Sequence, residues 1–154
     1  MLKMDGCTGL STSKRANSDM DNSLSLSSED SQMLDPILAE LSQRSGRKQT
    51  LDRLSSRWGR FVSKVEEGYR LSIYDYTNDL SIRDFLQVIL NNCPTDLHAR
   101  LHEWIESWDN RLILVTKQVE KPLLPPLGEE ELGWWWFRIP LHPEDELKKD
   151  LENW

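Results

Sequence analysis

The chain has 154 residues, with 19 basic and 26 acidic side chains and a formal net charge of −7 at pH 7. This length allows one domain with a modest core, and the acidic balance argues against general affinity for nucleic acid, which requires a basic surface. Two cysteines make no disulfide framework, which favours a reducing compartment. With no apolar run long enough to span a bilayer and no signal-peptide core, we expect a cytosolic protein.

Residues 1–33 are rich in serine, contain scattered acids and have no aromatic residue. Such a segment buries too little apolar surface to offset the entropy lost on ordering, so we predict a disordered tail. The remaining residues, 34–154, are predicted to form a single helical domain. Asp35 followed by Pro36 is typical of a helix start and predicts a short helix ending near Gly46.

Three main helices are predicted, at about 50–77, 81–92 and 96–119. The first has apolar residues at three- and four-residue intervals, namely Leu54, Trp58, Phe61, Val62, Val65, Tyr69, Ile73 and Tyr76. Ser81 followed three residues later by Asp84 predicts the capped start of the second helix. The run 112–116 also fits a buried strand, because β-branched residues suit a sheet, but the continuing helical spacing favours a helix.

The C-terminal part begins with residues 121–142, whose prolines favour an extended path. In an extended chain, Trp134 and Trp136 would face one side, and Trp135 and Phe137 the other. A short helix is predicted after them, with Leu147, Leu151 and Trp154 on one face. The expected fold is therefore all-α: a small three-helix bundle, an extended Trp-rich segment, a short terminal helix and a disordered N-terminal tail.

The aromatic run predicts a partner-binding site formed by Trp134, Trp135, Trp136, Phe137 and Arg138. Tryptophan and arginine are enriched at the hot spots of protein interfaces. The alternative is that these rings only fill the space between the segment and the helices. The favoured hypothesis is a non-enzymatic protein–protein interaction module, such as a regulator, a neutralising protein or an assembly chaperone, whose partner is another protein.

A basic stripe gives an alternative function. Arg53, Arg57, Arg60 and Lys64 recur at helical spacing beside the apolar stripe, and further basic residues precede them from residue 44. This possible anion-binding stripe, within residues 44–64, would suit a nucleic acid, an anionic surface or an acidic partner. It would equally suit an acidic segment of the same chain, or simply face solvent.

Two other groups of polar residues carry weaker hypotheses. His98, His102 and Glu106 have a spacing that can hold zinc, but a solvated helix face explains them better, so no metal site is predicted. A polar cluster at residues 75–84 would serve a small enzyme, although helix capping and an Asp79–Arg83 pair explain it without chemistry. No glycine-rich phosphate loop or nucleophile motif is present, so we predict no cofactor and no catalytic residue.

Overall fold

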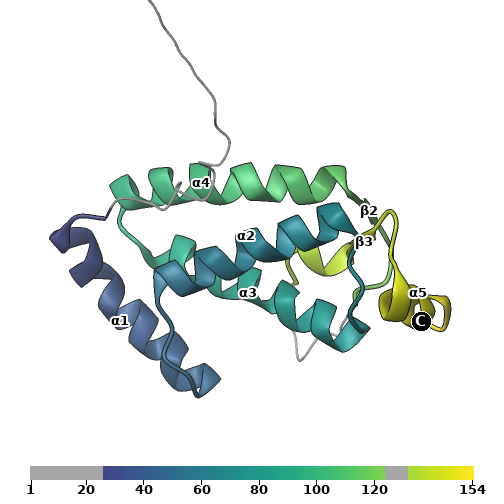
Figure 1. Cartoon of the computed structure of the whole chain (residues 1–154). Coiled ribbons are helices and arrows are strands. Elements are labelled where there is room, and N and C mark those ends of the chain that lie inside the picture. The colour runs from purple at the N-terminus through teal and green to yellow at the C-terminus, as the bar shows by residue number, and fades with distance from the viewer. Residues whose placement is uncertain (1–25, 124–131) are drawn as a thin grey trace, which may run out of the picture.

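The computed structural model describes residues 26–123 and 132–154 and shows the predicted mostly helical bundle (Figure 1). Residues 1–25 of the predicted tail and residues 124–131 of the proline-rich segment therefore lie outside the described residues. In chain order the elements are α1 (Ser28–Ser45), α2 (Leu51–Glu67), α3 (Ile73–Asn92), α4 (Thr95–Leu114), β2 (Thr116–Gln118), the 3₁₀ helix η2 (Trp134–Phe137), β3 (Arg138–Pro140) and α5 (Asp145–Glu152).

Helix α1 begins earlier than the sequence predicted and includes residues assigned to the tail. Ser27 caps it through a capping box with Asp30, in which each side chain accepts a hydrogen bond from the other's backbone. Pro36 lies inside the helix rather than at its start. Leu34 and Leu41, two turns apart and both buried, attach the helix to the core on either side of the proline, which offsets its local cost.

The break predicted near residues 77–81 instead lies at residues 68–72. Helix α2 ends at Gly68, which adopts φ 112°, a left-handed backbone conformation that favours glycine. Helix α3 starts at Ser72, which forms a capping box with Asp75. Ser81 lies inside α3, where its hydroxyl donates to the carbonyl oxygen of Asn78. The apolar stripe continues across the break because Tyr69 and the first turns of α3 face the same core.

The third predicted helix ends before residue 119. Helix α4 stops at Leu114, and residues 116–118 form strand β2, so the strand alternative for residues 112–116 matches the structure only at Thr116. Strand β2 pairs antiparallel with β3, with Thr116 opposite Pro140. The partner strand lies more than twenty residues further along the chain, so the local helical spacing of the sequence did not reveal it.

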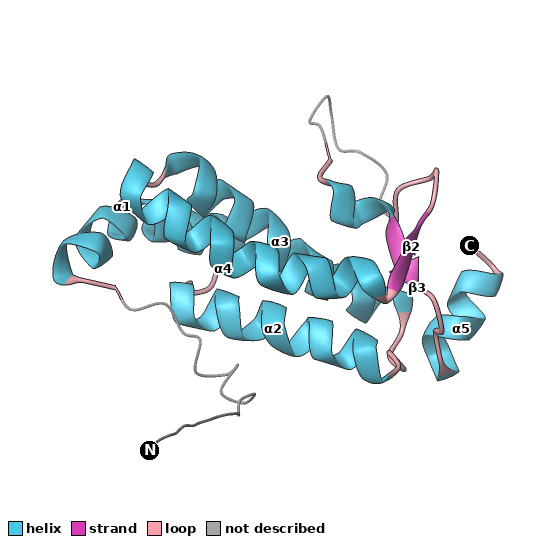
Figure 2. Ribbon diagram, turned by 90° about the horizontal axis from the view of Figure 1, so that it is seen from above, coloured by secondary structure: helices cyan, strands magenta, loops and turns pink. Residues whose placement is uncertain are grey.

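The core lies among α2, α3 and α4 (Figure 1). Helices α2 and α4 come close at Gly59, where an added methyl group would lie 3.0 Å from the ring of Trp108. Seen from above, η2 lies on the side of α3 away from α2, and α5 lies beside the two-stranded sheet at one end (Figure 2). Leu147 of α5 is fully buried, as predicted, while Trp154 remains 37% exposed.

An aromatic cluster at the α2–α3 turn is expected to make the stability of the fold depend on pH in the alkaline range. Tyr69 donates to Asp79 at 2.7 Å and Tyr76 donates to the carbonyl oxygen of Arg138 at 3.0 Å. Burial raises the pKa of both hydroxyls above the ordinary value, and the Asp79 carboxylate raises that of Tyr69 further. Above about pH 10 the unfolded chain loses protons that the folded chain keeps, so the stability present below this pH falls as pH rises.

We expect the free energy of unfolding to fall by up to about 1.4 kcal/mol per tyrosine for each pH unit above about 10. Urea unfolding followed by circular dichroism at a series of alkaline pH values would measure this slope. The Tyr69→Phe/Tyr76→Phe variant removes both hydroxyls and should show a shallower slope. An unchanged slope would show that other groups cause the pH dependence.

Candidate functional site

The aromatic run is a turn of 3₁₀ helix rather than the predicted extended chain. Trp135 and Trp136 are buried, with 4% and 2% of their surfaces exposed. Both indole nitrogens donate to Asp84 of α3, at 2.9 and 3.0 Å. The predicted alternation is therefore wrong, since the buried pair is adjacent in sequence and the half-buried rings are Trp134 and Phe137.

Gly133 permits the tight fold of this turn. A methyl group added there would overlap the ring of Trp135, which folds back over the backbone. Trp134 meets the buried Trp135 edge to face, with ring centroids 5.6 Å apart. Trp135 thus positions Trp134, and the hydrogen bonds from Trp135 and Trp136 to Asp84 fix the turn on α3.

Arg138 joins the segment to the end of α4 and β2. Its guanidinium donates to the hydroxyl of Thr116 at 2.9 Å, to the carbonyl oxygen of Thr116 at 2.8 Å and to that of Ile113 at 3.1 Å. A cation at a helix C-terminus is favourable, because the last carbonyl groups have no partner within the helix. Arg138, one of the residues of the predicted partner-binding site, therefore also ties the aromatic run to the end of α4 and to β2.

Trp134 and Phe137 line a small hollow, here called the aromatic pocket, together with Ile113, Gln118 and Arg138. Its volume is about 170 Å³, and three apolar side chains form most of its wall. Of the lining residues, Ile113 is 40% exposed. The pocket thus offers a largely apolar wall that reaches the protein surface at Ile113.

A second hollow, here called the polar cleft, lies between α3 and α4 and shares Ile113 and Trp134 with the aromatic pocket. Its volume is about 320 Å³. Its polar lining includes Arg83, Gln87, His98, His102, Glu106 and Asp109. Because Trp134 belongs to both hollows, one extended ligand can contact both.

The floor of the polar cleft is a buried ion pair. Arg83 donates from Nε and Nη2 to Asp109, at 3.2 and 2.9 Å, and the two residues are 5% and 7% exposed. Asp109 also accepts from the indole of Trp58 at 3.1 Å, while Arg83 lies over the ring of Trp135. Burial raises the pKa of Asp109 above its ordinary value, and the hydrogen bonds from Arg83 offset part of this shift.

The two histidines stack on the exposed face of α4, with ring centroids 5.9 Å apart. No group of three or more histidine, cysteine or carboxylate residues that could hold a metal ion occurs within residues 26–123 and 132–154. The side chains of His98 and His102 line the polar cleft and add polar groups to its wall.

The polar cluster at residues 75–84 does not form one site. Asp75 caps α3, Asp79 accepts from Tyr69, and Asp84 holds the two indoles. Arg83 pairs with Asp109 rather than with Asp79, so the predicted Asp79–Arg83 pair is wrong. Each of these residues therefore has a structural partner of its own, as helix capping would explain without chemistry.

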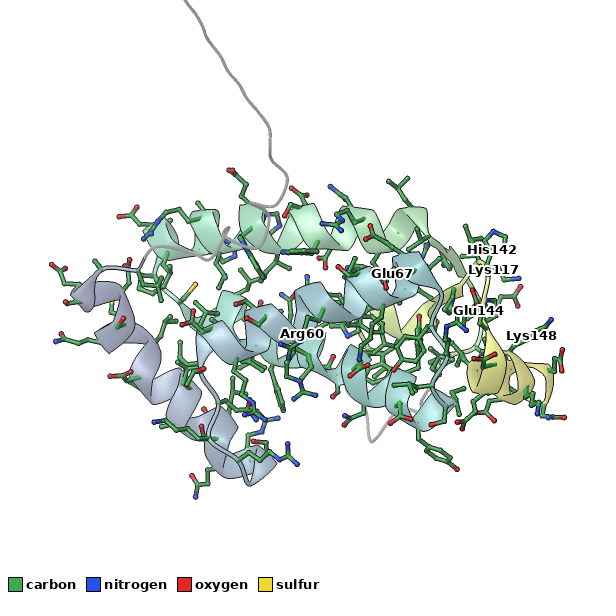
Figure 3. The ribbon with its side chains drawn as sticks, in the orientation of Figure 1. Arg60, Glu67, Lys117, His142, Glu144 and Lys148 are labelled. Atoms are coloured by element: carbon green, nitrogen blue, oxygen red, sulfur yellow. The ribbon has the colours of Figure 1, made fainter. Side chains whose placement is uncertain are left out.

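The predicted basic stripe lies along the outer side of α2. Arg53, Arg60 and Lys64 are exposed and Arg57 is half-buried. Figure 3 shows Arg60 on α2, away from the labelled side chains Lys117, His142, Glu144 and Lys148 at the end beside α5. Two acids of that end have another partner, since Arg70 pairs with Glu144 at 3.0 Å and with Asp145 at 3.3 Å.

The sequence pattern pointed to the aromatic segment and to several polar residues of the cleft, but not to Ile113 or Asp109. Ile113 belongs to the apolar run 112–116, and Asp109 is a single acid among the buried residues of α4. An isolated acid next to Trp108 in an otherwise apolar stripe was the available signal for a buried pair.

Comparisons with family models, curated proteins and solved structures gave no significant match to this chain. Among the described helices, none combines the length and the apolar character needed to cross a bilayer. The class defined by the fold is thus a mostly helical bundle, and its function must be argued from its own surfaces.

Proposed function

We propose that this chain is a non-enzymatic protein-interaction module that binds another protein at the aromatic pocket. The observation that carries the proposal is the position of Trp134, which forms a wall of both the aromatic pocket and the polar cleft. A half-buried tryptophan beside exposed apolar residues is typical of an interface hot spot. The cytosol is the proposed compartment, on the ground that the two cysteines of the sequence make no disulfide framework.

The pocket is prepared for binding by the residues beneath it. Trp135 and Trp136 are fixed by Asp84, and Arg138 is fixed by the end of α4. A ligand therefore does not have to order these groups, which lowers the entropic cost of association. The partner that fits is a protein segment with one apolar side chain for the pocket and flanking polar groups for the cleft.

The polar cleft adds selectivity to the apolar anchor. Its charged floor is already satisfied by the Arg83–Asp109 pair, while the rim carries His102 and Glu106 in exposed positions. Apolar burial supplies most of the binding energy in such an arrangement, and the polar rim fixes the register of the ligand. Binding should therefore depend only weakly on salt.

The test is a selection of displayed random peptides on the full chain, followed by affinity measurements on the enriched peptides. We expect peptides with a large apolar anchor, and Trp134→Ala should weaken their binding by about tenfold or more. Tyr74→Ala is the matched control, because Tyr74 is 83% exposed and lies outside both hollows. Equal binding to wild type and Trp134→Ala would refute the proposal.

A further inference from the structure

The outer side of α2 carries a second charged surface, here called the basic face, formed by Arg53, Arg57, Arg60 and Lys64. These residues occupy positions i, i+4, i+7 and i+11, so they share one stripe along about 16 Å of helix. The helix is anchored by its apolar side, which is buried against α3 and α4. The backbone that carries the basic face is therefore held in place.

Among residues 26–123 and 132–154, no ion pair neutralises the positive charge of this face. Within the described parts of the chain, none of its four residues has a carboxylate within ion-pair distance. Burial lowers the pKa of Arg57, the nearby Asp79 opposes this, and the charges of Arg53, Arg47 and Arg60 lower it further. Like charges held this close cost free energy, and a bound anion would relieve that cost.

Two shallow hollows lie along the face, and Arg57 and Arg60 line both. The first also contains Thr50, Ser56 and one acid, Asp52. The second contains Lys64 and the acid Asp79, whose carboxylate already accepts from Tyr69. Each guanidinium group at a hollow can bind a carboxylate through two parallel hydrogen bonds.

We propose that the basic face binds an acidic segment of a protein, with carboxylates at three- and four-residue spacing that match the stripe. The site is separate from the aromatic pocket, because η2 lies on the side of α3 away from α2 (Figure 2). Charge complementarity across such a surface mainly accelerates association and selects the partner. One chain thus offers two surfaces, one for an apolar anchor and one for an acidic segment.

An acidic peptide fits the face better than a nucleic acid does. Single-stranded nucleic acids bind where exposed aromatic rings stack on bases, and the rings of this helix, Trp58 and Phe61, are only 0% and 2% exposed. The chain as a whole has a net charge of −7, which repels an extended polyanion. A short acidic segment contacts the local positive surface and little else.

The test uses an Ala-rich peptide of about 18 residues, long enough to be helical, with glutamates at i, i+4, i+7 and i+11. A peptide of the same composition with regrouped glutamates and a single-stranded oligonucleotide of equal charge are the comparisons. We expect the patterned peptide to bind the full chain most tightly, with affinity falling as salt is raised. Arg57→Gln/Arg60→Gln should weaken this binding by about tenfold.

Lys148→Gln/Lys149→Gln is the control, because it makes the same change in net charge on exposed residues of α5. Arg53→Gln/Lys64→Gln gives a second reduction of the face at exposed positions, should the first pair disturb folding. Equal loss in the control, tighter binding of the oligonucleotide, or no binding of the patterned peptide would each overturn the inference. Trp134→Ala should leave this binding intact, so the inference and the proposed function fail separately.

Discussion

Replacement of Asp109 by alanine is expected to lower the free energy of unfolding by about 3–5 kcal/mol. The carboxylate accepts from the guanidinium of Arg83 and from the indole of Trp58, and all three residues are at least nine-tenths buried. Its removal leaves a buried charge and a buried indole without their acceptor, and each carries a desolvation cost. Urea unfolding followed by circular dichroism would measure the loss.

The double variant Arg83→Met/Asp109→Leu separates the cost of a broken pair from the value of the pair itself. An apolar replacement of both partners removes the uncompensated charge, so most of the stability should return. A loss below about 1 kcal/mol in Asp109→Ala would contradict the expectation, since a pair so weak behaves like one on the surface. It would indicate that water reaches the floor of the polar cleft.

Two identical local patterns show where sequence reasoning reached its limit. Ser72 and Asp75, like Ser81 and Asp84, have the serine–acid spacing of a capping box. The chain uses the first as the cap of α3 and the second inside the helix, where Asp84 binds two indoles more than fifty residues away. Local sequence does not distinguish the two, and only tertiary contacts decide between them.

The helices themselves were predictable because their apolar faces repeat at helical spacing. The buried residues of α2, including Leu54, Trp58, Phe61, Val62 and Val65, are those named from periodicity. Boundaries were less predictable, since the stripe continues through Gly68 onto α3. The left-handed backbone of this glycine ends α2 within the stretch 50–77 that was predicted as one helix.

The candidate site was only partly readable from the sequence. The aromatic run is evident from its composition, but its conformation depends on Gly133 and on the hydrogen-bond acceptor Asp84 in α3. In the sheet, Lys117 pairs with Ile139, 22 residues further along the chain, and Arg83 pairs with Asp109, 26 residues further along. Such pairings depend on how whole helices pack, which local propensity does not encode.

Replacement of Asp84 by alanine is expected to lower the free energy of unfolding by about 2–3 kcal/mol and to disturb the aromatic pocket. Trp135 and Trp136 would lose a charged acceptor in a largely buried place, and hydrogen bonds to charged groups are the stronger ones. Because Trp134 packs on Trp135, its position would also become less fixed. Urea unfolding measures the first effect, and the affinity of pocket-binding peptides measures the second.

Asp84→Asn is the matched control for this prediction. Asparagine keeps one side-chain oxygen, and both indoles donate to Oδ1 of Asp84, while the indole of Trp136 also reaches Oδ2 at 3.2 Å. The neutral variant should therefore retain more stability than alanine and lose only the charge-assisted part of the two bonds. Equal stability of the alanine variant and wild type would mean that packing alone holds the turn. The aromatic pocket would then owe its shape to Gly133 and the contacts of Arg138.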